Sequence, residues 1–108
     1  ILHSEAVLIR RCNGSDPIGL EQLRRRLDGV LVARTYVMLD YDCPESLVGE
    51  ASQITPGFES PTVSPLAREG WVAVRAMVPS AEAHRLMDEL WELGARAILV
   101  TEIAACRL

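Results

Sequence analysis

The chain has 108 residues, of which 49% are hydrophobic and 24% charged, and its formal net charge is −4. This composition is typical of a globular protein, and the length suffices for one modest domain. The negative charge argues against nucleic acid as a main partner, because phosphate binding requires a basic field. The basic cluster Arg24–Arg26 lies within a helical pattern and is interpreted as a solvated helix face.

The three cysteines, Cys12, Cys43 and Cys106, lie far apart, and none has a neighbour at metal-ligand spacing. Reduced thiols of this kind are typical of a cytoplasmic protein. No apolar run approaches the roughly 20 residues that span a bilayer, and the first residues lack the basic start of a signal peptide. We therefore expect a cytoplasmic location without membrane contact. The absence of an initial Met suggests a piece of a longer protein.

The first third of the chain predicts a strand followed by a long helix. The apolar run Ala6–Ile9 indicates a buried strand. Asp16 suits a helix N-cap and Pro17 the first helical position, so a helix is expected over 17–34. Alone, these two elements cannot form a core, and we expect them to pack on something absent from the chain or on another copy of it. The apolar positions of the helix are Leu20, Leu23, Leu27, Val30 and Leu31.

The next segment predicts a strand, a short helix and an edge strand. Strand-forming residues occupy Tyr36–Tyr41, and Pro44 with Glu45 opens a helix that Pro56 and Gly57 stop. Thr62–Val63 is expected at a sheet edge, because the neighbouring prolines cannot donate to a strand ladder. The apolar positions of the short helix are Leu47, Val48, Ala51 and Ile54.

The last segment repeats this pattern. Trp71–Val78 alternates between aliphatic and mixed positions, which predicts a strand with one buried face. A second helix is expected with Ser80 as N-cap and Gly94 as its stop, followed by a buried strand over Ala97–Val100. The predicted buried stripe of this helix is Ala83, Leu86, Met87, Leu90 and Leu93.

From Tyr36 the order is strand, helix, strand, strand, helix, strand. This order predicts an α+β, ferredoxin-like βαββαβ domain, with two helices on one face of a four-stranded antiparallel sheet. The other face is then uncovered. Exposed apolar surface of this kind indicates an interface, so we expect an oligomer. The residues expected on the uncovered face are Arg75, Met77, Ala97, Leu99 and Thr101.

The stretch Thr55–Leu66 contains three prolines and a glycine. Each proline fixes its own φ and biases the preceding residue toward an extended conformation. The stretch is either a stiff connector or one wall of a small-molecule site, since polar groups held still lose less entropy on binding. From the residues alone, the connector interpretation is favoured.

Asp40 and Asp42 flank Tyr41 and occupy alternate positions of a strand. Such a pair can serve as a general acid and base or as part of a metal site, but the residues around it do not form a recognisable pattern that completes either. Asp42 is better suited to a ligand ammonium group or to a helix N-terminus. The sequence also contains no glycine-rich phosphate loop, so no catalytic set is apparent in it.

Several motifs together resemble one family. They are the run Val37–Pro44, the Pro-Gly-Phe-Glu-Ser-Pro-Thr run at 56–62, Trp71–Arg75 and the closing Gly-Ala-Arg-Ala-Ile-Leu run at 94–99. In these motifs the chain resembles the C-terminal part of the long-form ATP phosphoribosyltransferases, the first enzymes of histidine biosynthesis, and most closely their actinobacterial branch. The resemblance covers essentially the whole chain.

The resemblance implies that residues 1–34 are the last strand and helix of a catalytic region. Residues 35–108 would be a ferredoxin-like, ACT-like regulatory domain that binds L-histidine as a feedback inhibitor between neighbouring subunits. Family members are dimers that assemble into hexamers. Their magnesium, ATP and phosphoribosyl pyrophosphate sites would lie upstream of this chain. The chain alone is therefore expected to bind no metal and to be inactive as a transferase.

The resemblance also implies the effector contacts: Asp42, Phe58, Thr62, Met77 and Ala97, with Gly57, Glu59 and Ser60 close by. A free amino acid needs an anion for its ammonium group, donors for its carboxylate and a lining for its side chain. Asp42 can provide the first and the Ser60–Thr62 segment the second. The family often has Leu at the positions of Phe58 and Met77, which keeps an apolar wall. The alternative function is a structural oligomerisation module that binds no ligand.

Overall fold

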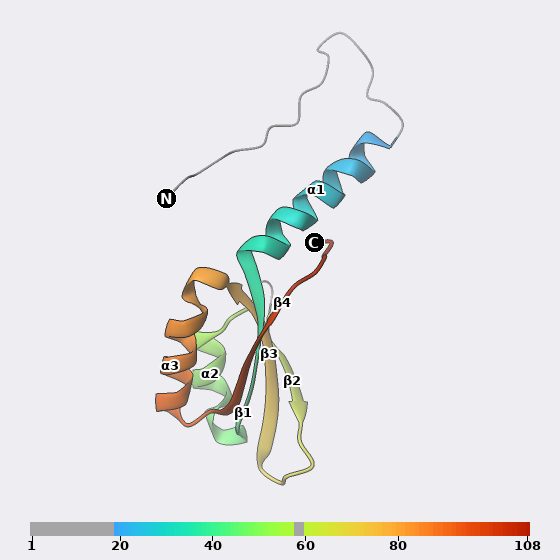
Figure 1. The fold of residues 1–108 in the computed structure, drawn as a ribbon. Helices are drawn as coiled ribbons and strands as arrows, with labels where there is room; N and C mark the ends of the chain where they lie inside the picture. Colours follow the sequence, from blue (N-terminus) through green and yellow to red (C-terminus); the bar gives the residue numbers. More distant parts are fainter. Residues whose placement is uncertain (1–18, 58–59) are drawn as a thin grey trace.

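The computed structural model describes residues 19–57 and 60–108 (Figure 1). The predicted strand Ala6–Ile9 and the predicted N-cap Asp16 lie outside the described residues. The long helix, α1, spans Leu20–Thr35, and its predicted first residue, Pro17, lies outside the described residues. It begins there because Gly19, with φ of 88°, has a left-handed backbone that cannot continue a helix toward the N-terminus.

The remaining elements follow the predicted order. They are β1 (Tyr36–Pro44), the 3₁₀ turn η1 (Glu45–Leu47), α2 (Val48–Ile54), β2 (Thr62–Pro65), β3 (Trp71–Pro79), the 3₁₀ turn η2 (Ser80–Glu82), α3 (Ala83–Leu93) and β4 (Arg96–Glu102). The strands form one sheet in the order β2-β3-β1-β4, and each neighbouring pair is antiparallel. This topology confirms the ferredoxin-like prediction.

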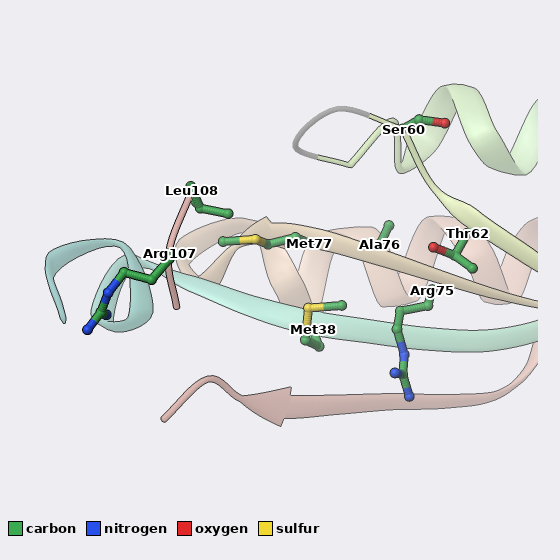
Figure 2. A pocket seen from close by; sticks show the side chains of 8 residues that line it. All are labelled: Met38, Ser60, Thr62, Arg75, Ala76, Met77, Arg107 and Leu108. Carbon is green, nitrogen blue, oxygen red and sulfur yellow. The ribbon is translucent and has the colours of Figure 1, made fainter. Parts of the chain in front are cut away.

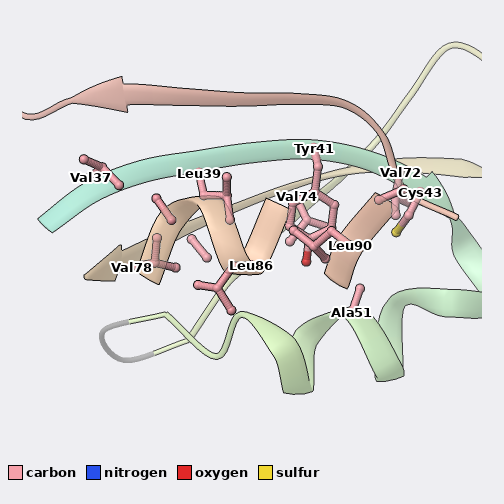
Figure 3. Close-up of a cluster of buried hydrophobic side chains, with 13 residues drawn as sticks. Val37, Leu39, Tyr41, Cys43, Ala51, Val72, Val74, Val78, Leu86 and Leu90 are labelled. Atoms are coloured by element: carbon pink, nitrogen blue, oxygen red, sulfur yellow. The ribbon is translucent and has the colours of Figure 1, made fainter. Parts of the chain in front are cut away.

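The core lies between the sheet and the two helices α2 and α3, which cover the same face (Figures 1 and 3). Along β1 and β3 every second residue is buried, as alternation in a half-covered strand requires. The predicted aliphatic face of β3 is confirmed. The buried side chains of the central strands are Val37, Leu39, Tyr41 and Cys43 from β1, and Val72, Val74, Ala76 and Val78 from β3.

Helix α3 buries most of its predicted stripe. Ala83, Leu86 and Leu90 are buried, and Met87 and Leu93 pack partly against the core. The predicted C-terminal stop at Gly94 is confirmed, since its φ is 120° and its N–H lies 3.1 Å from the carbonyl oxygens of Leu90 and Trp91.

The prediction of Ser80 as N-cap of this helix is wrong. Ser80 is the first residue of η2, and α3 begins three residues later, at Ala83. Neither η2 nor α3 has a side-chain cap hydrogen bond. Because Pro79 ends β3 with an extended backbone, the chain makes a 3₁₀ turn before it reaches the helix.

The prediction for one outer strand is confirmed and the prediction for the other is wrong. Strand β2 lies at a sheet edge, as predicted. The burial predicted for Ala97–Val100 is wrong, because β4 forms the other edge and most of its residues are exposed. Leu99 is 62% exposed, whereas Ile98 packs partly against the core. An apolar run alone does not distinguish a central strand from an edge strand.

Helix α1 projects away from the sheet and its two covering helices (Figure 1). Its apolar side chains are largely uncovered, and Gly29 is its single buried residue. None of the helices within 19–57 and 60–108 is long and apolar enough to cross a membrane. The exposed apolar residues of α1 are Leu23, Leu27, Val30 and Leu31.

Candidate functional site

The face of the sheet opposite α2 and α3, here called the open face, carries the alternate residues of β1 and β3. Strand register places Met38 beside Met77, Asp40 beside Arg75, and Asp42 beside Ala73. Thr62, the first residue of β2, is the partner of Arg75 on its other side. The placement of Arg75 and Met77 on this face agrees with the prediction from alternation.

A pocket of about 480 Å³ opens at one end of the open face (Figure 2). Its size falls within the usual range of small-molecule sites. Two methionines, two hydroxyl residues and two arginines among the lining residues provide both apolar contact and hydrogen bonding. The pocket therefore suits a small ligand with polar ends. Its lining residues are Met38, Ser60, Thr62, Arg75, Ala76, Met77, Arg107 and Leu108.

One ion pair crosses the middle of the open face. Arg75 Nε donates to Asp40 Oδ1 at 2.7 Å. This hydrogen bond and the carboxylate charge raise the pKa of Arg75 above its usual value. Because Asp40 is bound to Arg75, an acid–base pair of Asp40 with Asp42 is disfavoured. Within the described part of the chain, no three His, Cys, Asp or Glu side chains gather closely enough to hold a metal ion.

Neither Asp42 nor Ala97 is among the residues that line the pocket. Asp42 pairs with Arg96 of β4, the residue before Ala97. Asp42 lies four positions along β1 from Met38, about 13 Å, but only two positions from Asp40, whose strand partner Arg75 lines the pocket. The pocket thus brings together three predicted contacts, Ser60, Thr62 and Met77, whereas Asp42 and Ala97 are not among its lining residues.

The loop before β2 contains the remaining predicted contacts. Phe58 and Glu59 lie outside the described residues. Gly57 has φ of 76°, and a Cβ atom there would lie 3.2–3.4 Å from the backbone of Ser60 and Pro61. Glycine therefore permits both the turn and the close return of the loop. Ser60 is exposed, and its hydroxyl donates to the carbonyl of Pro61 at 3.4 Å.

Comparison with known protein sequences identifies the family of this chain. Residues 33–105 match the family model described as HisG, C-terminal domain. The chain belongs to the HisG C-terminal domain family. It is 61% identical to a Streptomyces coelicolor protein named ATP phosphoribosyltransferase, 62% to one of that name from Streptomyces avermitilis, and 59% to another from Kocuria rhizophila. These matches cover 100% of this chain but 38–39% of each relative. The chain thus spans about two fifths of these relatives' length.

In this HisG C-terminal domain, sequence reasoning did not single out five of the lining residues as ligand contacts: Met38, Arg75, Ala76, Arg107 and Leu108. Met38 could have been found from alternation, since it shares a strand face with Asp40 and Asp42. Arg107 and Leu108 follow β4 without any periodic pattern. Only the path of the chain in three dimensions brings them to the pocket.

Thr55 holds the start of the proline-bounded loop in place. The sequence did not single it out as a core residue. Thr55 is fully buried, and its Oγ1 lies 2.7 Å from the Tyr41 hydroxyl. Thr55 also donates from this oxygen to the carbonyl of Ala51 at 3.2 Å. Since a hydroxyl has a single proton to donate, Tyr41 is the donor to Thr55. The loop of this family member therefore departs from a fixed point in the core.

Proposed function

We propose that this chain is the regulatory C-terminal region of an ATP phosphoribosyltransferase, the enzyme of the first step of L-histidine biosynthesis. The parent enzyme would convert ATP and phosphoribosyl pyrophosphate to phosphoribosyl-ATP and diphosphate, with magnesium held upstream of this chain. Residues 1–34 would belong to the catalytic region and residues 35–108 to a regulatory domain. The names of the similar proteins support the activity.

We further propose that the open face binds L-histidine as an allosteric feedback inhibitor. The observation that carries this proposal is the pocket, where the predicted contacts Ser60, Thr62 and Met77 converge. Hydroxyls of Ser60 and Thr62 are suitable donors to an amino acid carboxylate. The Met38 and Met77 thioethers form an adaptable apolar wall for its side chain.

Because Asp42 and Ala97 are not among the residues that line the pocket, a site shared between copies of the chain is favoured. One copy would supply the pocket residues, and its neighbour would supply Asp42 for the ammonium group. The edge strand β4 offers apolar surface for such a contact, with Leu99 62% exposed and Val100 40% exposed. The same surface supports the alternative function, a structural oligomerisation module without a ligand.

Thermal melting of the purified chain with L-histidine tests the proposal against this alternative. Histidine at about 100 times its dissociation constant should add about 2.7 kcal/mol to the free energy of unfolding, because it binds only the folded state. Other amino acids should add much less. No shift at millimolar histidine, in a sample that sedimentation shows to be oligomeric, would leave the oligomerisation module as the better explanation.

Asp42→Ala tests the ammonium role within the same experiment. It should abolish the histidine-dependent shift while leaving the fold intact, because Asp42 is only half-buried at the sheet surface. Asp88→Ala is the matched control, since Asp88 is an exposed carboxylate on α3, away from the open face. A full shift in Asp42→Ala would show that another group receives the ammonium.

A further inference from the structure

The last six residues of the chain, Ile103–Leu108, connect the open-face pocket with helix α1. They leave the end of β4 and run alongside α1 (Figure 1). Cys106 Sγ lies 3.1 Å from the carbonyl oxygen of Gly29 and donates to it. The next two residues, Arg107 and Leu108, line the pocket. This short segment therefore contacts both helix α1, through Cys106, and the pocket, through Arg107 and Leu108.

Gly29 is the point on α1 against which the Ile103–Leu108 segment packs. This contact is here called the seat, and the segment is seated while the contact is formed. A Cβ atom at Gly29 would overlap the carbonyl oxygen of Cys106 and would lie 3.1 Å from Nη1 of Arg107. The backbone of the segment therefore approaches the helix more closely than any other residue type would permit. A glycine inside a helix lowers helix stability, so this one is explained by the contact that it allows.

The pocket end of the segment presents an uncovered apolar side chain. Leu108 is 70% exposed and points toward Met77, whereas Arg107 points away from the pocket, toward α1 (Figure 2). Arg107 Nη1 donates to the carbonyl of Cys106 at 2.8 Å, which holds the turn between the two ends. A ligand beside Met77 would bury the Leu108 side chain, and this contact exists only while the segment is seated.

We propose that Ile103–Leu108 is a strap that forms a ligand-dependent wall of the open-face pocket and fastens that pocket to α1 through Gly29. A ligand that contacts Leu108 binds the seated form more tightly and so shifts the population toward it. By linkage, seating of the strap strengthens ligand binding by the same factor by which the bound ligand favours seating. The identity of the ligand, L-histidine, rests on the proposed function; the seating of the strap does not.

Gly29→Ala tests the seat, with Gly49→Ala as its matched control. Both changes add one methyl group to a helix, but a Cβ atom at Gly49 meets nothing within 4 Å. The rate of Cys106 alkylation by N-ethylmaleimide, followed by mass spectrometry of the Cys106 peptide, reports whether the strap is seated. Gly29→Ala should raise this rate by about tenfold, as expected when a closed segment opens. Gly49→Ala should leave it unchanged.

Histidine binding to the same proteins tests the coupling. In the unsubstituted chain, saturating L-histidine should slow Cys106 alkylation, and Gly29→Ala should weaken histidine binding by the factor by which it lowers the seated fraction. Leu108→Ala removes the pocket contact without changing the seat. It should weaken histidine binding severalfold while the alkylation rate without histidine stays unchanged.

The outcomes separate the strap from the histidine site. If Gly29→Ala leaves Cys106 alkylation unchanged, the strap is not seated and the inference is wrong. If histidine binds all variants equally and does not protect Cys106, the strap is no part of the site, but the proposed function stands. If the unsubstituted chain binds no histidine, the coupling and the proposed function both fail, whatever the alkylation rates show about the seat.

Discussion

The hydrogen bond between Tyr41 and Thr55 joins the central strand to the end of α2. Both side chains are almost fully buried, at 1% and 0% exposure, and the bond measures 2.7 Å. Thr55 is also the C-cap residue that directly follows α2, and its N–H donates to the carbonyl oxygen of Ala51 at 3.0 Å. The position of the loop that carries Gly57 and Ser60 therefore depends on a polar contact inside the core.

Tyr41→Phe should lower the free energy of unfolding by about 1 kcal/mol at neutral pH, the usual net value of one buried hydrogen bond. Chemical denaturation measures this difference. Thr55→Val and the double variant complete a cycle that isolates the pair, because the two side chains are in direct contact. Additive losses in the double variant would mean that the two hydroxyls do not interact.

The same tyrosine should lower the free energy of unfolding at alkaline pH. Burial raises the pKa of Tyr41 above its ordinary value of 10.0, although the hydrogen bond with Thr55 opposes this. Above pH 10 the unfolded chain therefore loses this proton while the folded chain retains it, so stability falls with rising pH. Tyr41→Phe should show a smaller fall. Burial also raises the pKa of Cys43 above 9.0, and this contribution should remain in the variant.

At the scale of elements, the irregularity in β4 is the main departure from an ideal sheet. The register with β1 shifts between Asp40 and Asp42, and Ala97 adopts a φ of 53°. A left-handed alanine costs about 1–2 kcal/mol, so surrounding contacts must hold this bulge in place. Arg96 supplies one such contact, since its guanidinium group stacks on Trp91 at 3.8 Å.

Substitutions at Ala97 should therefore change the free energy of unfolding in an order that is unusual for a strand residue. Ala97→Gly should be as stable as the unsubstituted chain or more so, while Ala97→Val should lose about 1 kcal/mol or more, because β-branched residues resist positive φ. Thermal unfolding measures the order. Ala73, on the regular strand β3 of the same face, is the control position, where valine should be favoured over glycine. The same order at both positions would contradict a left-handed Ala97.

At the scale of the whole molecule, the described residues form one compact body and one projecting helix. The body has a continuous core, whereas α1 keeps Leu31 57% exposed and Leu23 47% exposed. Apolar helix faces of this kind are normally covered. This arrangement agrees with a chain that spans only 38–39% of the length of its relatives.

The 108-residue chain alone should therefore show no transferase activity. Its sequence has no glycine-rich phosphate loop, and its described residues hold no acidic cluster for a metal ion. The measurement is the formation of phosphoribosyl-ATP from ATP and phosphoribosyl pyrophosphate with magnesium. The full-length Streptomyces coelicolor relative serves as the positive control. Product formed by the purified chain would contradict the assignment of catalysis to the upstream region.

The sequence by itself determined the order of the elements, the buried face of β3, the edge position of β2 and the stripe of α3. These features follow from local periodicity and from prolines, whose effects act within a few residues. The tertiary structure alone decided the edge position of β4, the burial of Thr55 and the meeting of Cys106 with Gly29. Each of these depends on residues distant in sequence, because strand pairing and side-chain packing are set by where the chain returns in space.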